Sequence, residues 1–211
     1  LHDTTYWSLR DTNGHYHIYD QMGTELSYTA TNHIKRVDTL RFNDTQSWKF
    51  QDTNNHYHLV DQQGNELAIT QNYDVTATQN WYRDGEVYLS VKDSNNQTHF
   101  FANDINTITK TLNGNLSLFN SFKLNDTRLF TFTSNVDGYQ IFDLNGQSLS
   151  LPANTRSIQI FSNSNKDHLV ARDTLNNFSL LQDDGTVITP IGFSGEIKSL
   201  STIQFNGQDH W

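Results

Sequence analysis

Apolar and polar residues alternate along this chain in short stretches, which are separated by clusters of Asp, Asn and Gly. In 33–42 the apolar positions are Ile34, Val37, Leu40 and Phe42. Such alternation predicts strands, and Asn and Asp tolerate the backbone angles of tight turns. Between 33 and 70 the pattern predicts four strands, which we name A (33–42), B (48–51), C (57–60) and D (66–70). No stretch of ten residues has apolar positions at helical spacing, so almost no helix is expected.

The alternating pattern recurs with a nearly fixed period, and 48–67 matches 7–26 almost letter for letter. A turn aspartate gives the series Asp11, Asp52, Asp93, Ser134 and Asp173, at intervals of 41, 41, 41 and 39 residues. A turn glycine gives Gly23, Gly64, Ile105, Gly146 and Gly185, at the same intervals. Two independent series with matching intervals predict five repeats in one domain, 1–211, with approximate limits 7–47, 48–88, 89–129, 130–168 and 169–211.

Four short antiparallel strands in about 40 residues is the size of one propeller blade. The chain enters its first repeat at the second strand, near Trp7, and ends after a first strand, 197–205, followed by Trp211. The sequence therefore predicts an all-β, five-bladed β-propeller with four antiparallel strands per blade. The C-terminal strand would pair with the N-terminal blade and close the ring, which removes exposed sheet edges. An open solenoid is the alternative, but solenoids need polar capping repeats, and neither end shows one.

The net charge of −9, from 14 Lys+Arg and 23 Asp+Glu, disfavours nucleic acid and anionic membrane surfaces as partners. No apolar run is long enough to cross a bilayer, so no membrane insertion is expected within this chain. The absence of cysteine excludes disulfides and thiolate metal sites. Because the chain begins at Leu1 without a leader pattern, we expect a processed product or a piece of a larger, surface-displayed bacterial protein.

The blade pattern is clearest in the fourth repeat, in Gly138-Tyr139-Gln-Ile141-Phe-Asp143-Leu-Asn-Gly146. It resembles bacterial WG-repeat proteins over about ten residues of each repeat, although their Trp-Gly pair is missing. In size and blade count the chain also looks like the five-bladed lectins of the tachylectin-2 type. That resemblance is architectural, and it implies binding of amino sugars.

Histidines gather in His15-Tyr16-His17 and His56-Tyr57-His58, and His99 stands at the repeat position of His17 and His58. Residues two apart share a face of a strand, so His15 and His17 can be proposed to chelate one metal ion. The fourth and fifth repeats carry Gln140 and Ser179 instead, which favours polar strand residues. The turns starting at Asp11 and Asp52 resemble calcium loops, but position twelve is Met22 or Gln63 rather than an acid. No metal and no cofactor are predicted.

Aromatic residues and carboxylates are the other candidate groups. One repeat position carries an aromatic residue in some repeats (Trp7, Trp48, Phe130 and Trp211) and a leucine in others (Leu89 and Leu169). Aliphatic residues at this position indicate core packing rather than sugar stacking. Most carboxylates stand at repeated turn positions, and no unrepeated pair is typical of a glycosidase acid and base. A non-catalytic module is therefore expected, with a small glycosidase-like enzyme and a structural spacer as alternatives.

Binding residues tend to lie on loops held by a rigid scaffold. In a propeller the turns between the second and third strands would form one amide-rich, weakly charged face. The sequence predicts that this face binds a glycan or a protein, outside the cell or at its surface. The candidate ligand-binding residues are Asn13, His15, Asn54, His56, Asn95 and Trp81.

Overall fold

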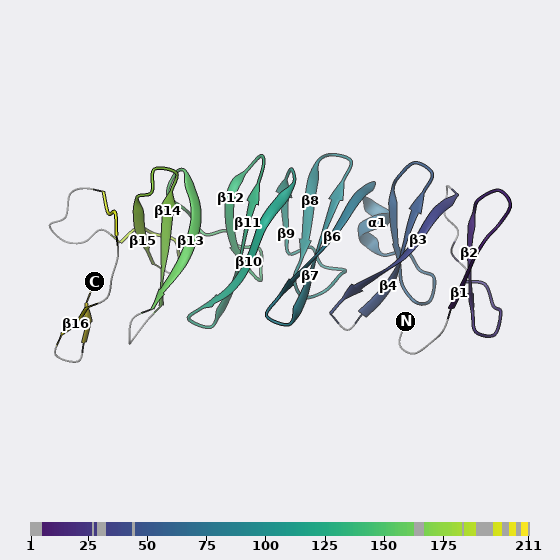
Figure 1. The fold of residues 1–211 in the computed structure, drawn as a ribbon, viewed down its shortest axis with the longest axis horizontal. Coiled ribbons are helices and arrows are strands. Elements are labelled where there is room, and N and C mark those ends of the chain that lie inside the picture. The colour runs from purple at the N-terminus through teal and green to yellow at the C-terminus, as the bar shows by residue number, and fades with distance from the viewer. Residues whose placement is uncertain are drawn as a thin grey trace. The chain divides into compact units, whose positions relative to one another are not determined.

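The computed structural model describes residues 6–26, 28, 33–43, 45–162, 167–182, 184–188, 196–199, 203–205 and 208–210. In these residues the chain is all-β apart from one short helix, and it divides into two compact units, Leu1–Asn115 and Leu116–Trp211. The sheets are small and antiparallel, and sequence neighbours pair with one another (Figure 1). This arrangement confirms the prediction of propeller-like blades. Trp211 lies outside the described residues.

The first unit contains three sheets in chain order. They are β1 (Tyr6–Arg10) with β2 (Tyr16–Asp20), then β3 (Ile34–Phe42), β4 (Thr45–Asp52) and β5 (Tyr57–Val60), and finally β6 (Val75–Arg83), β7 (Glu86–Asp93), β8 (Gln97–Phe101) and β9 (Lys110–Asn113). The helix α1 (Ala68–Asn72) follows β5.

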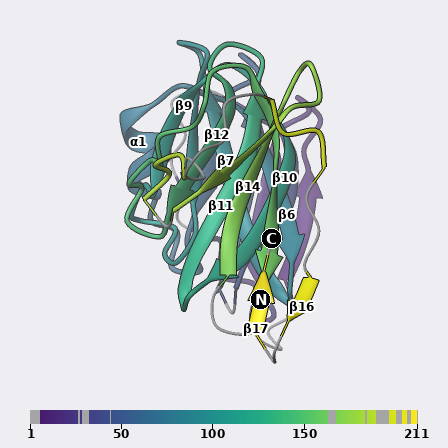
Figure 2. The ribbon, with the colours of Figure 1, turned by 90° about the vertical axis from the view of Figure 1, so that its left-hand side faces the viewer.

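The second unit contains two three-stranded sheets and one hairpin. The sheets are β10 (Leu116–Leu124), β11 (Thr127–Ser134) and β12 (Gly138–Asp143), and β13 (Thr155–Ser162), β14 (Asp167–Asp173) and β15 (Phe178–Leu181). The hairpin is β16 (Ile203–Phe205) with β17 (Gln208–His210). Strands within a sheet cross at an angle, as the right-handed twist of β-structure requires (Figure 2).

The second to fifth repeats each contribute strands A, B and C of one sheet, whereas the described strands of the first repeat are B (β1) and C (β2). The predicted strand D is mostly absent from the described residues. In the second repeat, the expected strand 66–70 is reduced to a single bridge between Val60 and Glu66, followed by α1. Similar single bridges end the first, fourth and fifth repeats, and among the described residues a full strand at this place occurs only in the third repeat, as β9. The prediction of four strands per blade is therefore correct for one described sheet.

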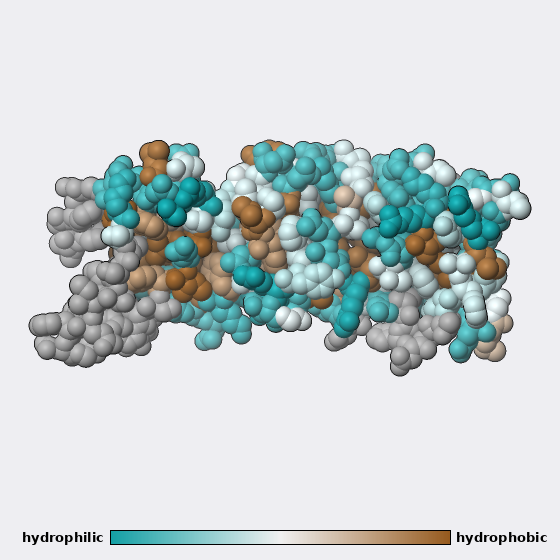
Figure 3. All heavy atoms as spheres, in the orientation of Figure 1, coloured by the Kyte–Doolittle hydropathy of each residue, from teal (hydrophilic) through white to brown (hydrophobic). Residues whose placement is uncertain are grey.

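The sheets of each unit pack face to face through apolar residues. In the first unit, Trp48 and Phe50 on β4 pack with Ile18 on β2, and Leu40 and Leu59 pack with Leu89 on β7. In the second unit a corresponding cluster joins β10–β12 to β13–β15; it contains Leu129, Ile141, Ile158 and Leu169. The predicted core positions Trp48, Leu89, Phe130 and Leu169 are buried, whereas Trp7 is 61% exposed. Elsewhere, hydrophilic residues dominate the visible surface (Figure 3).

The aspartates of the repeat close the turns between strands with their side chains. At the B–C turn, Asp52 Oδ1 accepts hydrogen bonds from the backbone N–H groups of Asn54 (2.9 Å) and His56 (2.8 Å). The same two bonds occur at Asp11, Asp93 and Asp173, and Ser134 Oγ accepts a similar pair. The C–D turns repeat the pattern at Asp20, Asp61 and Asp143. This confirms that the aspartates serve hairpin geometry.

Candidate functional site

The structure brings five of the six candidate residues to one edge of the first unit, formed by its three B–C turns. Asn13, Asn54 and Asn95 have exposed side chains, and their backbone N–H groups donate to the turn aspartates at 2.8–2.9 Å. The carboxylate of the turn aspartate therefore fixes the backbone that carries each exposed amide side chain. We call this surface the turn edge.

Contacts between the turns show that they are neighbours. The His15 ring stacks on the His33 ring with centroids 3.6 Å apart, and the His33 carbonyl accepts a hydrogen bond from Thr53 N (3.0 Å). In the same way His56 Nδ1 lies 3.9 Å from Asp74 Oδ1, and the Asp74 carbonyl accepts from Ser94 N (2.9 Å). The residue that begins each strand A thus links the turn of its own sheet to the turn of the preceding sheet.

Trp81, the sixth candidate, is not brought to the turn edge. It lies on β6 opposite Tyr88, close to the A–B turn at the other end of the strand. Its indole Nε1–H donates to Ser90 Oγ (2.9 Å) on the neighbouring strand. That bond holds the half-buried ring against the sheet, so Trp81 is separate from the other five residues.

The histidines of strand C link the B–C turn to the end of the sheet rather than to one another. His58 Nδ1 lies 2.8 Å from Glu66 Oε1, and its Nε2 lies 3.5 Å from Asp52 Oδ2. His17 has the same partners in the first repeat, Glu25 at 2.7 Å and Asp11 at 3.7 Å. The hydrogen bond to the glutamate is the largest cause that raises the pKa of each of these histidines.

His15 and His17, which the sequence suggested as joint metal ligands, share one neighbour in the structure, because both lie near Asp11 Oδ2, at 3.5 Å and 3.7 Å. Their other contacts differ: the His15 ring stacks on His33, and His17 hydrogen-bonds to Glu25. In the part of the chain that the structure describes, no three His, Asp or Glu side chains have positions that could hold a metal ion. No helix in that part has the length and apolar character needed to cross a bilayer.

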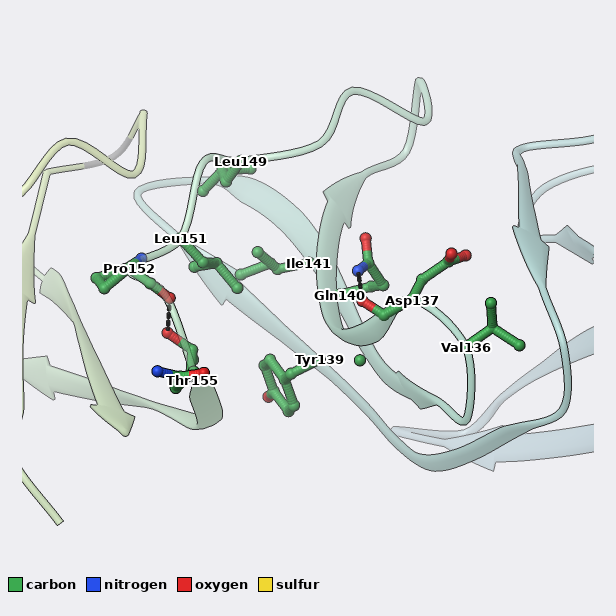
Figure 4. Close-up of a pocket in the computed structure, with 11 residues that line it drawn as sticks. Val136, Asp137, Tyr139, Gln140, Ile141, Leu149, Leu151, Pro152 and Thr155 are labelled. Atoms are coloured by element: carbon green, nitrogen blue, oxygen red, sulfur yellow. Dashed lines mark hydrogen bonds between the residues drawn. The ribbon is translucent and has the colours of Figure 1, made fainter. Parts of the chain in front are cut away.

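The second unit has a pocket of about 500 Å³ next to its first B–C turn (Figure 4). The turn contributes Val136, Asp137 and Gly138, strand β12 contributes Tyr139, Gln140 and Ile141, and the connection to β13 contributes Leu149, Leu151, Pro152, Asn154 and Thr155. Gln140 Nε2 donates to the Asp137 carbonyl (2.7 Å), and Thr155 Oγ1 donates to the Pro152 carbonyl (2.6 Å). Burial raises the pKa of the Tyr139 phenol.

The sequence interpretation placed every turn between the second and third strands on the predicted face, which includes 135–137 after Ser134, but it missed Tyr139 and the segment 149–155. A signal for them was present, because the repeat interval falls from 41 to 39 residues between Ser134 and Asp173. The missing two residues lie in the segment that lines the pocket, between Leu149 and Thr155.

Neither a known protein family nor a curated protein matches this sequence. Similar solved structures include dihydro-heme d1 dehydrogenase NirN in complex with DHE, with 11% identity over 83% of this chain and 42% of that chain, at a TM-score of 0.39. BBS1N in complex with ARL6DN has 9% identity over 95% of this chain and 66% of that chain (TM-score 0.31). A mitotic checkpoint complex has 13% identity over 94% and 63% (TM-score 0.35).

This chain spans less than two thirds of the length of each of these three structures. The TM-scores are low, and the resemblance carries no argument about function.

Proposed function

We propose that this chain is a non-catalytic binding module that recognises a glycan through its B–C turns. One observation carries the proposal: the turn aspartates fix the backbone of each B–C turn and leave the amide side chains of Asn13, Asn54 and Asn95 exposed. An amide offers two donor hydrogens and a carbonyl acceptor, which matches the mixed donor and acceptor character of sugar hydroxyls. A preformed backbone also lowers the entropy lost when a ligand binds.

The charge of the chain supports an uncharged ligand. The net charge is −9, so anionic glycans, phosphate groups and acidic protein surfaces meet a repulsive field. The carboxylates beneath the turn edge are also occupied, since Asp52 and Asp93 are buried and each accepts two backbone hydrogen bonds. Carboxylates with this role are poorly placed to act as the acid and base of a glycosidase, which favours binding over hydrolysis.

The proposed scaffold is a closed ring of five blades, with a location outside the cell or at its surface. The support for closure is the first sheet, where Trp7 and Leu9 are exposed although the equivalent pairs, Trp48 with Phe50 and Leu89 with Val91, are buried by the preceding sheet. A last blade beside β1 would cover them. Among the described strands near the two ends of the chain, β1 pairs with β2 and β16 pairs with β17.

The double substitution Asn54→Ala with His56→Ala tests the turn edge. Both backbone N–H groups remain, so the bonds to Asp52 and the fold are retained. We expect at least an about tenfold loss of affinity for the best hit of a glycan array, as one or two lost hydrogen bonds would cause. The matched control is Gln62→Ala with Gln63→Ala, in the C–D turn at the other end of the same strand.

Equal affinity of the two double variants would exclude the turn edge as the binding surface. A wild-type chain that binds no glycan, but captures a protein from the native surface, would replace the glycan by a protein partner.

A further inference from the structure

The segment between strand C and the next strand A differs in length between the second and fourth repeats. Seven residues, 68–74, separate Leu67 from Val75, whereas five residues, 150–154, separate Leu149 from Thr155. Both segments begin with the same bond, in which the leucine N–H donates to a strand C carbonyl, of Leu59 (2.7 Å) or Ile141 (3.1 Å). The two segments therefore start from equivalent positions.

The longer segment fills the space between two sheets. It forms α1, whose Ile69 is buried in the cluster with Leu59 and Leu89, and Tyr73 packs against that cluster with its ring 4.3 Å from the His99 ring. The shorter segment forms no helix and carries Leu151 and Pro152 instead. Leu151 packs against the apolar cluster of the second unit, and the segment also lines a pocket of about 500 Å³ beside it (Figure 4).

We propose that this pocket is a second saccharide site of the chain, separate from the turn edge, and that it takes one uncharged, hydroxyl-rich ring, such as a terminal pyranose. The proposal rests on the glycan-binding function proposed above and adds a site in the fourth repeat. The volume lies within the range of about 300–1,000 Å³ that is typical of small-molecule sites.

The lining has two parts that match the two faces of a sugar ring. The half-buried side chains of Leu149, Leu151 and Pro152, with the ring of Tyr139, offer apolar surface that can pack against C–H groups, while Ile141 lies buried behind them. Asp137, Gln140, Asn154 and Thr155 supply a carboxylate, two amides and a hydroxyl, which together accept and donate hydrogen bonds. A sugar hydroxyl both donates and accepts, so it can pair with each of these groups.

The same lining discriminates against charged ligands. None of the described lining residues is Lys, Arg or His, so the carboxylate, sulfate or phosphate of an anionic ligand would have no charged partner. Asp137 is the only carboxylate among them, and it lies in the exposed turn at the rim. A basic peptide side chain would pair with Asp137 alone and leave the amide groups unused, which favours the neutral ring.

Refilling the pocket is the sharpest test. Replacing 150–154 by the seven-residue sequence of 68–74 restores the residues that fill this space in the second repeat. In a chain that also carries Asn54→Ala and His56→Ala, we expect the affinity for methyl pyranosides, followed by saturation-transfer NMR, to fall at least about tenfold. The matched control inserts Ser-Gly after Ala153, which adds the same length without the apolar side chains and should keep most of the affinity.

Two point variants serve if the graft does not fold. Asn154 has a φ of 60°, so Asn154→Gly removes the amide without backbone strain. Asp137→Asn removes the charge and keeps the shape. We expect Asn154→Gly to weaken pyranoside binding about tenfold, and Asp137→Asn to weaken it less, because an amide oxygen still accepts from a hydroxyl.

The outcomes separate this proposal from the function on which it rests. Glycan binding that survives the graft and Asn154→Gly, but is lost in the Asn54→Ala, His56→Ala variant, would overturn the pocket and keep the glycan-binding function. No glycan binding by the wild-type chain would overturn both. Preferential binding of lysine or arginine methyl ester, abolished by Asp137→Asn, would reassign the pocket to a cation.

Discussion

One histidine position illustrates how the same residue takes different roles as its surroundings change. The side chain of His17 is 38% exposed, that of His58 is 15% exposed, and that of His99 is 1% exposed. All three lie close to the aspartate of their own B–C turn, at 3.3–3.7 Å. The second partner is a glutamate in the first two repeats and Thr111 in the third. Repetition in the sequence thus preserves the proximity of the ring to the turn aspartate, while the charge around the ring differs.

The stability of the fold should depend on the protonation of His58. Its pKa is raised above 6.5 by the hydrogen bond to Glu66, so the folded chain favours the charged ring. A raised folded pKa contributes stability that is fully present below the unfolded value of 6.5 and is lost as the pH rises through the folded value. We expect the free energy of unfolding in urea to fall over that window.

The control is His58→Gln, which installs the residue type found at the equivalent position, Gln140. This variant should lose the part of the pH dependence that His58 provides. His17, which is more exposed than His58, should contribute less, because solvent screens its bond to Glu25. A pH profile that is identical in wild type and His58→Gln would exclude this role.

At the scale of the element, the turns are fixed by side chains and the strands by repeated pairing. Asp52 is fully buried and accepts two backbone N–H groups, which would otherwise lack a protein partner. The same bonds recur in the B–C turns of both units, which explains why aspartate or serine stands at this position in every repeat. The turn edge is therefore rigid in backbone and variable in side chain.

Asp52→Ala should destabilise the chain by about 2 kcal/mol, because two part-buried N–H groups lose the acceptor that a fully buried carboxylate provides, at about 1 kcal/mol each. Asp52→Asn keeps an oxygen acceptor and should cost about 1 kcal/mol or less. Urea unfolding of both variants measures the difference. The comparison is Asp61→Ala in the more exposed C–D turn of the same sheet, where water can replace the carboxylate. Equal costs for Asp52→Ala and Asp52→Asn would show that the acceptor oxygen is unimportant.

The elements that could be predicted from the sequence are those set by local rules. Strand 57–60 was predicted with the limits of β5, because alternation and the flanking turn residues are visible in the sequence. The predicted strand 66–70 was wrong, since Ile69 and Thr70 are buried by packing between sheets, in a helix that no periodicity indicated. The pocket likewise depends on how the segment between two sheets packs. The one sequence signal for it was the shorter repeat interval between Ser134 and Asp173.

At the scale of the whole molecule, the first sheet has an apolar face without a described partner. Trp7 pairs with Tyr19 and Leu9 with His17 across β1 and β2, so these four side chains share one face, opposite the face that carries Ile18. Ile18 packs against the second sheet. The exposed pair Trp7 and Leu9 occupies the positions at which the next two sheets are buried by the sheet before them. The face therefore fits the proposed ring, in which the last blade precedes the first.

Closure of the ring makes the energetic cost of Trp7→Ala depend on the C-terminal segment. If residues 189–211 cover Trp7, the substitution should cost about 3 kcal/mol or more in the full chain, close to Trp48→Ala, because large buried aromatic residues cost about 3–5 kcal/mol when truncated. In a chain that ends at Ile188, Trp7→Ala should fall to within about 0.5 kcal/mol of neutral, as surface substitutions do. Trp48→Ala should cost the same in both chains, since its partners Tyr6 and Ile18 lie in the first unit. The measurement is urea unfolding of wild type, Trp7→Ala and Trp48→Ala in each of the two chains, which gives the energetic coupling between Trp7 and the C-terminal segment. A cost of Trp7→Ala that is small in both chains would leave the first sheet uncovered, and the five blades would then not form a closed ring.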